Sequence, residues 1–157
     1  MNNQTIATFA CEIIQSEFHL IGQSITANFP QGFPEAAIKV QKDFIARRDE
    51  IIQAKNKEIL FSPHMCNEIV ATYFACLEVD EITDIPEGMI GFSLPKTKYA
   101  KISCSNKTID QGYSKIFTWM GENDYRQKWL NNCCPIEIFY FEDNVDEERV
   151  DILIPIL

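Results

Sequence analysis

The order of strand-like and helix-like segments is the feature that most restricts how this chain can fold. β-branched and aromatic residues gather in six short runs, and two longer runs have apolar residues at helical spacing. The strand-like runs are 18–29, 58–65, 67–82, 98–105, 135–143 and 150–157, and the helix-like runs are 35–57 and 106–123. The order strand, helix, strand, strand therefore occurs twice.

This repeated order predicts an α+β fold made of two tandem units, with pseudo-repeats at about 18–82 and 98–157. Each unit is expected to be a small antiparallel sheet with a helix on one face. A unit of ~60 residues buries little surface alone, so we expect the two to join edge to edge and share a sheet. Such an arrangement leaves a cleft between the halves, a common place for a small-molecule site. The length of 157 residues favours a single domain over 1–157.

Charge and composition exclude several classes of function. The net charge of −9 argues against binding nucleic acid or an anionic membrane, because both need clustered Lys and Arg. No run approaches the ~18–20 apolar residues of a membrane span, and no signal peptide is visible. The six cysteines form no CxxC pair and have no zinc-like spacing with the two histidines. We therefore expect a cytoplasmic protein with reduced cysteines, no bound metal and no cofactor.

An acid, Glu137, interrupts the apolar strand "PIEIFYFED". The two-residue period of a strand places Glu137, Phe139 and Phe141 on one face and Ile136, Ile138 and Tyr140 on the other. We expect the Ile/Tyr face to pack under the helices and the Glu/Phe face to be open. A carboxylate beside aromatic rings suits an organic cation, through charge pairing and cation–π attraction. The alternative is a strand face on which Glu137 is merely solvated.

Two further aromatic residues are candidates for ligand contact. Trp119 lies at the edge of the apolar stripe of the second helix, and Tyr73 lies in the strand "ATYFACL". Core packing is the alternative for both. No catalytic residue is predicted, because the chain has no G-x-S-x-G, P-loop or G-x-G-x-x-G motif and both histidines stand outside any motif.

Four stretches together resemble the GyrI-like (gyrase-inhibitor-like) small-molecule-binding family. They are "TYFACLEVDEITDIPEGMIGFSLPKTKYAKI", "KIFTWMGENDY", "PIEIFYFED" and "VDILIPI", at 72–102, 115–125, 135–143 and 150–156. The same fold forms the effector-binding domain of AraC-type and multidrug-responsive bacterial transcription activators. The resemblance implies two strand–helix–strand–strand units around a central pocket, with Glu137 deep in it. It also implies that lipophilic cations meet this glutamate while Trp119, Phe139 and Tyr73 stack around them.

The sequence also departs from the family pattern. Phe139 and Leu153 stand where relatives often have tyrosine, so the pocket is expected to be more apolar. Some relatives are hydrolases that use the glutamate and a nearby tyrosine to handle water, and the loss of two phenols weakens that alternative here. Because 157 residues leave no room for a DNA-binding domain, we expect a stand-alone binding protein.

Three functions are therefore considered. The first is capture of lipophilic, cationic small molecules through Glu137. The second is hydrolysis of strained or electrophilic compounds, with Glu137 activating water. The third is a gyrase-inhibitor-like interaction with a protein partner, for which the acidic segment 142–151 is the only sequence feature.

Overall fold

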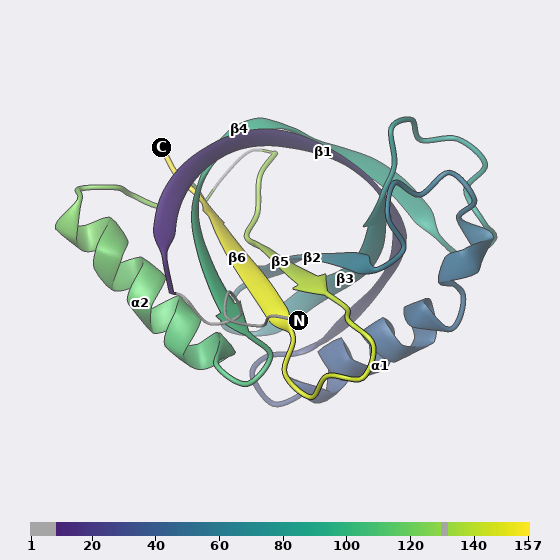
Figure 1. Ribbon diagram of the computed structural model, residues 1–157, viewed down its shortest axis with the longest axis horizontal. Helices are drawn as coiled ribbons and strands as arrows, with labels where there is room; N and C mark the ends of the chain where they lie inside the picture. The colour runs from purple at the N-terminus through teal and green to yellow at the C-terminus, as the bar shows by residue number, and fades with distance from the viewer. Residues whose placement is uncertain (1–8, 130–131) are drawn as a thin grey trace. The chain divides into compact units, whose positions relative to one another are not determined.

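The computed structural model describes residues 9–129 and 132–157 (Figure 1). These residues form six strands and two α-helices, with one short 3₁₀ helix, and the predicted α+β class is confirmed. In chain order the elements are β1 (Cys11–Asn28), α1 (Glu35–Ile45), η1 (Arg48–Glu50), β2 (Ile59–Cys66), β3 (Val70–Glu78), β4 (Ile90–Ser105), α2 (Ile109–Glu122), β5 (Ile136–Tyr140) and β6 (Arg149–Pro155). No helix in the described part of the chain is long and apolar enough to cross a membrane.

The chain divides into two compact units. The N-terminal unit comprises residues 18–93, and the C-terminal unit comprises 94–157 together with the described residues before 18. Each contains the strand, helix, strand, strand order, so this part of the sequence prediction is also confirmed. The cleft expected between the halves stays a prediction. The assignment of 1–157 to one domain also stays a prediction, and part of that range lies outside the described residues.

In the N-terminal unit, β3 is the middle strand and pairs antiparallel with both β1 and β2. Tyr73 of β3 lies between Ile25 of β1 and His64 of β2. The helix α1 packs on this sheet along β3, and its buried side chains are Ala36, Val40 and Phe44. Their spacing of four residues places them on one face of the helix.

The helix predicted over 35–57 is too long, because α1 ends at Ile45. Arg47 binds the carboxylate of Glu50 with two hydrogen bonds of 2.8 Å and also donates to the carbonyl of Glu87. Arg48 donates to the carbonyl of Lys57 at 3.0 Å. Arg47 and Arg48 thus hold the segment that follows the helix.

The strand β4 is longer than the predicted 98–105, because it begins at Ile90. Gly91, close to the start of β4, is tightly packed. A Cβ atom at Gly91 would lie only 2.4 Å from Cγ2 of Ile82. Any larger residue at this position of the strand would collide with the neighbouring segment, which explains the glycine.

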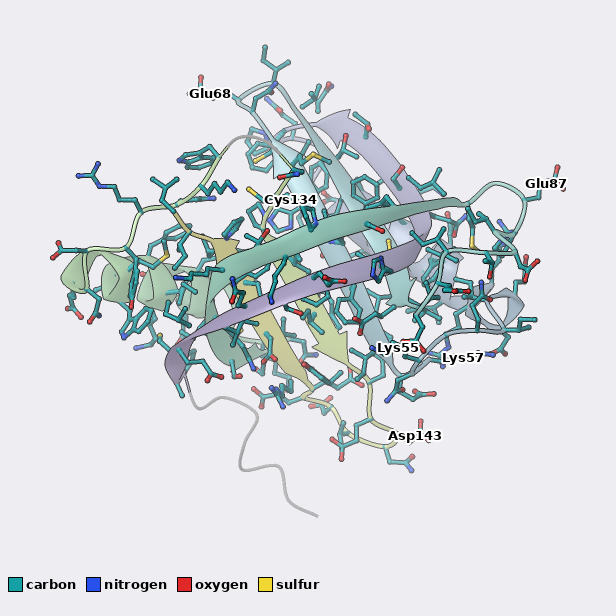
Figure 2. The ribbon with its side chains drawn as sticks, turned by 90° about the horizontal axis from the view of Figure 1, so that it is seen from above. Lys55, Lys57, Glu68, Glu87, Cys134 and Asp143 are labelled. Atoms are coloured by element: carbon teal, nitrogen blue, oxygen red, sulfur yellow. The ribbon has the colours of Figure 1, made fainter. Side chains whose placement is uncertain are left out.

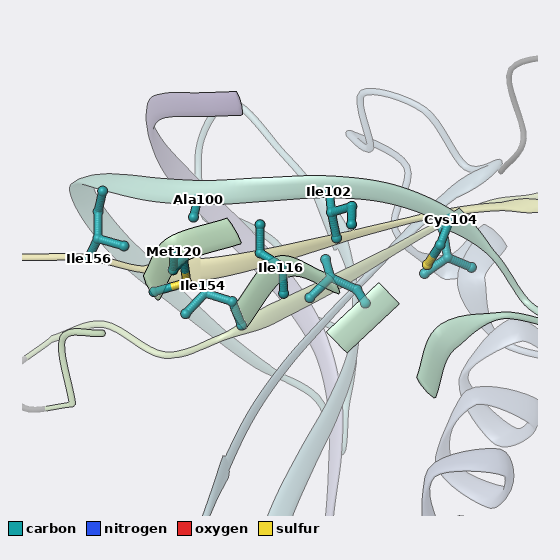
Figure 3. Packing of buried hydrophobic residues seen from close by; sticks show 9 residues of the cluster. Ala100, Ile102, Cys104, Ile116, Met120, Ile154 and Ile156 are labelled. Atoms are coloured by element: carbon teal, nitrogen blue, oxygen red, sulfur yellow. The ribbon is translucent and has the colours of Figure 1, made fainter. Parts of the chain in front are cut away.

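In the C-terminal unit, β6 is the middle strand and pairs antiparallel with β4 and β5. Ile116 and Met120 of α2 pack on apolar residues of β4 and β6 (Figure 3). The buried members of this core are Ala100, Ile102, Cys104, Ile116, Met120, Val150, Ile152, Ile154 and Ile156. In this unit β4, β6 and β5 thus form an antiparallel sheet with α2 on one face.

The prediction for the two faces of β5 is wrong. Glu137 of β5 pairs with Ile152 of β6, and Ile152 pairs in turn with Ile102 of β4. Residues that pair directly lie on the same face of a sheet. Because Ile102 and Ile152 belong to the core under α2, Glu137 shares the face that α2 covers. Phe139 packs against the same core, whereas Ile136 and Ile138 are buried on the other face. The pattern of one strand could not show this, because both faces of this sheet are apolar.

Gly112 lets α2 approach the sheet closely. A Cβ atom at this position would lie 2.8 Å from Sγ of Cys104 and 3.0 Å from Cδ1 of Ile152. Both distances are shorter than ordinary van der Waals contact. Gly121, near the end of the same helix, has no atom within 4 Å of such a Cβ.

These two glycines give a matched test of the close approach. Gly112→Ala is expected to lower the free energy of unfolding by about 2 kcal/mol, because the added methyl group overpacks the core. Gly121→Ala is expected to raise it by about 0.5–1 kcal/mol, because alanine favours the helix and meets nothing. Urea unfolding followed by circular dichroism measures both. Equal effects of the two substitutions would contradict close packing at Gly112.

Candidate functional site

Glu137 lies on β5, half-buried at the edge of the surface that α2 covers. The phenol of Tyr113 in α2 donates a hydrogen bond to Oε2 of Glu137. A hydrogen bond to an ionised carboxylate is shorter and stronger than one between neutral groups. Glu137 is therefore not simply solvated, as one of the two sequence alternatives had it, but is held by a helix residue; the other alternative, a cation that meets Glu137, stays a prediction.

Further aromatic residues lie on the same elements as this hydrogen-bonded pair. Tyr113 stacks on Phe117, one turn further along α2, with ring centroids 6.4 Å apart and an angle of 19° between the planes. Phe139 lies on the same face of β5 as Glu137 and packs against the core. The carboxylate of Glu137 thus contacts one phenol of α2, and the other aromatic residues of this region lie on α2 and on the same face of β5.

Tyr113 is the site residue that sequence reasoning missed. Tyr113 lies in the helix-like run 106–123, whereas the sequence comparison considered phenols only at Phe139 and Leu153, which are both in strand-like runs. Phe139 indeed offers no hydroxyl, and the phenol comes from α2 instead. The signal in the sequence was a tyrosine on the helix face that packs on the sheet.

Trp119 makes its observed contacts elsewhere in the C-terminal unit. Its ring stacks on Tyr125, just beyond the end of α2, with centroids 5.4 Å apart and planes 27° apart. It also packs against the core of the unit. The core-packing alternative therefore accounts for these contacts of Trp119, and ligand contact stays a prediction.

Tyr73 belongs to the other unit and has polar and aromatic neighbours there. Its side chain is only 7% exposed. Its hydroxyl accepts a hydrogen bond of 3.2 Å from Nε2 of Gln41, and its ring stacks on His64 at 5.8 Å. Its role as a ligand contact is likewise a prediction.

The opposite face of the C-terminal sheet carries a second carboxylate, Asp151, which is 1% exposed. Arg149 binds it with two hydrogen bonds of 3.0 and 2.8 Å, and Ser103 and Tyr140 donate at 2.7 and 3.0 Å. Arg149 also lies over the ring of Tyr140, with its guanidinium carbon 4.4 Å from the centroid. Because a buried charge needs this degree of pairing, we assign Asp151 a structural role.

Both carboxylates influence the buried thiol of Cys104. Burial raises the pKa of Cys104 to about 12, and the negative charges of Asp151 and Glu137 add to the shift. Two anionic groups therefore act on the same small core. An added positive charge on the Glu137 side would be favoured by this field.

The acidic segment 142–151 is largely engaged within the protein. Asp146 pairs with Lys107 at 2.8 Å, and Glu147 accepts a hydrogen bond from Ser105. Glu148 accepts a hydrogen bond from the backbone of Glu142 at 2.9 Å. The Asp143 side chain points outward from the loop between β5 and β6 (Figure 2). The charge run mainly organises its own loop, which weakens the case for a protein-binding surface.

Metal binding has no support in the residues described. Across 9–129 and 132–157, no three His, Cys, Asp or Glu side chains gather closely enough to hold an ion. The cysteines among these residues are all free thiols.

The fold is shared with solved structures of low sequence identity. One is SAV2435 bound to tetraphenylphosphonium, with a TM-score of 0.66 and 12% identity, covering 94% of each chain. Another is the integron cassette protein VCH_CASS2 of Vibrio cholerae, with a TM-score of 0.64 and 10% identity, covering 94% of this chain and 95% of that one. The EcmrR C-terminal domain has a TM-score of 0.67 and 12% identity, covering 96% of this chain and 98% of that one. No curated protein matches the sequence.

These similarities and the geometry define an α+β protein with the fold of bacterial effector-binding domains, carrying a carboxylate among aromatic rings. The model of the Cass2 family, described as integron-associated effector binding protein, matches residues 3–156. The chain belongs to this family. The resemblance to GyrI-like effector-binding domains is thereby confirmed, and the family assigns the protein to the binders of small-molecule effectors.

The chemistry of the cysteines offers a test of the packing beside Glu137. A pKa of about 12 leaves roughly one Cys104 thiol in 10⁴ ionised at pH 8, and burial blocks access as well. Cys66 is exposed. We expect iodoacetamide at pH 8 to modify Cys66 at least ~100 times faster than Cys104, measured by mass spectrometry of tryptic peptides.

Denatured protein is the control, because both thiols are then accessible and should react at similar rates. Equal rates in the folded protein would show that α2 does not seal the core around Cys104.

Proposed function

We propose that this effector-binding protein captures lipophilic organic cations and that Glu137 recognises their charge. The observation that carries the proposal is the half-buried carboxylate held by Tyr113 among aromatic side chains. A carboxylate in partly apolar surroundings attracts a cation more strongly than one in bulk water, because the local dielectric is lower. The aromatic rings add stacking and cation–π attraction, of roughly 0.5–2 kcal/mol for a desolvated cation.

The hydrogen bond from Tyr113 supplies orientation. It fixes Oε2 of Glu137 toward α2, so the carboxylate has one preferred position before a ligand arrives. A fixed carboxylate loses less conformational entropy on binding than a mobile one. Tyr113 thus acts as a positioning residue for Glu137.

The ligand class has support from a relative. The compound bound to SAV2435, tetraphenylphosphonium, is a lipophilic cation surrounded by phenyl rings. We extend this ligand class to the present chain because its carboxylate offers the matching charge. Phe139 is the proposed ring contact next to Glu137, and Trp119 and Tyr73 remain proposed contacts from the sequence.

Binding is favoured over the two alternatives. The family is one of effector-binding proteins, which favours ligand capture over hydrolysis. The acidic segment is engaged by Lys107 and Ser105, so a protein partner has less support. We also propose that capture takes place in the cytoplasm, as the composition indicated.

The charge hypothesis can be tested with two ligands of similar size. Glu137→Gln is expected to weaken binding of methyltriphenylphosphonium at least about tenfold, because a charge-assisted interaction of roughly 1.5–3 kcal/mol is lost. Binding of the neutral methyltriphenylsilane, which has the same shape, should change less than about twofold, because it has neither a charge nor a hydrogen-bonding group to meet residue 137. Isothermal titration calorimetry measures both dissociation constants.

Asp143→Asn is the matched control, since Asp143 is an exposed carboxylate in the loop after β5. This variant should bind both ligands like the wild type. An equal loss of both ligands in Glu137→Gln would show that the substitution damages packing rather than charge recognition.

A further inference from the structure

Unpaired cations gather at one end of the C-terminal sheet. In the parts of the chain that the structure describes, most Lys and Arg side chains lie within ion-pair distance of a carboxylate. Lys96, Lys98, Arg126 and Lys128 are exceptions among these residues, because no acidic side chain pairs with any of them. Trp129 follows Lys128 directly, and its side chain is 74% exposed. Free positive charges beside an exposed tryptophan are unusual in a protein with a net charge of −9.

The segment that carries Arg126 and Lys128 lies against the end of β6. Gln127 forms an antiparallel bridge with Ile156. The carbonyl of Arg126 accepts a backbone hydrogen bond of 2.9 Å from this end of the chain, and the N–H of Lys128 donates one of 2.8 Å to it. Because the backbone groups of successive residues in an antiparallel strand point to opposite sides, the N–H and C=O of Gln127 point away from β6.

The outward side of Gln127 is an unpaired strand edge. Within 9–129 and 132–157, neither its N–H nor its C=O has a hydrogen-bond partner, and the residue is half-exposed. Unpaired backbone groups of this kind bind extended segments of other chains. Arg126 and Lys128 are two residues apart, so their side chains lie on the same face of this edge.

Two further cations add to the positive field. Lys98 of β4 flanks the same end of β6, because its carbonyl accepts a hydrogen bond of 3.0 Å from the N–H of Ile156. Lys96 lies two residues earlier on β4 and is also exposed. The acids just before the segment, Glu122 and Asp124, form no ion pair with these cations in the described chain. We call Lys96, Lys98, Arg126, Lys128 and Trp129, with the backbone of Gln127, the basic edge.

We propose that the basic edge docks an acidic, extended segment of a partner protein. The segment adds to Gln127 as a further strand, its carboxylates meet Arg126 and Lys128, and one of its apolar side chains packs on Trp129. Charge complementarity favours an acidic partner, since these cations have no acidic partner within the described chain.

A peptide segment is favoured over nucleic acid for two reasons. The backbone edge of Gln127 matches the hydrogen bonding of a strand, and a net charge of −9 repels a phosphate backbone. The basic edge is a different surface from the acidic segment 142–151. The proposal does not rest on cation capture at Glu137, so each of the two can fail without the other.

A synthetic acidic peptide tests the proposal. The probe is the fluorescein-labelled peptide DEFDEFDE, and its match is NQFNQFNQ, in which amides replace all carboxyl groups. Titrations followed by fluorescence anisotropy are expected to give a dissociation constant below about 100 µM for the acidic peptide and at least about tenfold weaker binding of the amide peptide. DEFDEFDE with N-methyl groups on alternate residues should also bind at least about tenfold more weakly, because it cannot donate to a strand edge.

Charge reversal separates the basic edge from the charge of the whole protein. Arg126→Glu combined with Lys128→Glu should weaken DEFDEFDE binding at least about tenfold. The matched control is Lys42→Glu combined with Lys115→Glu, which changes the net charge equally at two exposed cations on the helices. It should change binding less than about twofold in 0.1 M salt, where charges more than ~10 Å apart are largely screened. Trp129→Ala should weaken binding about fivefold.

All these variants should keep the melting temperature within about 3 °C of wild type, because the substituted side chains reach the surface. No binding of DEFDEFDE overturns the proposal, and so does equal binding by the amide peptide or by the charge-reversed basic edge. Equal binding of the N-methylated peptide overturns strand addition at Gln127.

Two further outcomes would assign the basic edge to another occupant and overturn the proposal. One is tighter binding of a twelve-nucleotide uridine RNA that is lost in the charge-reversed variant, which would indicate single-stranded RNA. The other is self-association of the wild type without peptide, measured by analytical ultracentrifugation and lost in the same variant. That result would indicate a second copy of this chain.

Discussion

The close packing of α2 on β4 and β6 is the constraint on which the candidate site depends. Gly112 allows the helix backbone to approach Cys104 and Ile152, and Ile116 and Met120 complete the apolar contact one and two turns later. Tyr113 follows Gly112 directly, so the same approach brings its phenol within reach of Glu137 on β5. A helix held further from the sheet would leave the carboxylate without this partner. The geometry of the site is thus a consequence of packing in the core.

The two carboxylates of the C-terminal sheet show how the surroundings assign different roles to the same chemical group. Asp151 is almost fully buried and is compensated by Arg149, Ser103 and Tyr140, and such a network stabilises one arrangement of the strands. Glu137 is half-buried, and its carboxylate accepts a hydrogen bond from a neutral phenol. A neutral donor orients a carboxylate but does not cancel its charge. The site can therefore combine a defined geometry with attraction for a cation.

The two units repeat an element order but not a chemistry. In each, the helix sends a polar side chain to the strand that follows it: Gln41 reaches β2 at Ser62, and Tyr113 reaches β5 at Glu137. In the N-terminal unit the group that is reached is a neutral hydroxyl, and in the C-terminal unit it is an acid. The same local arrangement of helix and strand therefore carries different chemistry in the two units.

The sequence by itself determined the α+β class and the repeated element order, because periodicity and turn residues are local properties of the chain. The family was indicated by the resemblance of four short stretches to a known pattern. It also identified Glu137 as unusual, since an acid inside an apolar strand stands out without any structure. Only the tertiary structure decided which face of β5 the helix covers, because both faces of that strand are apolar and pairing with β6 sets the choice. It likewise revealed the contacts of Tyr113 and Gln41. Tyr113 meets Glu137, which lies 24 residues further along the chain. Gln41 meets Ser62 and Tyr73, which lie 21 and 32 residues further along. Contacts at that separation arise from packing, which no local pattern records.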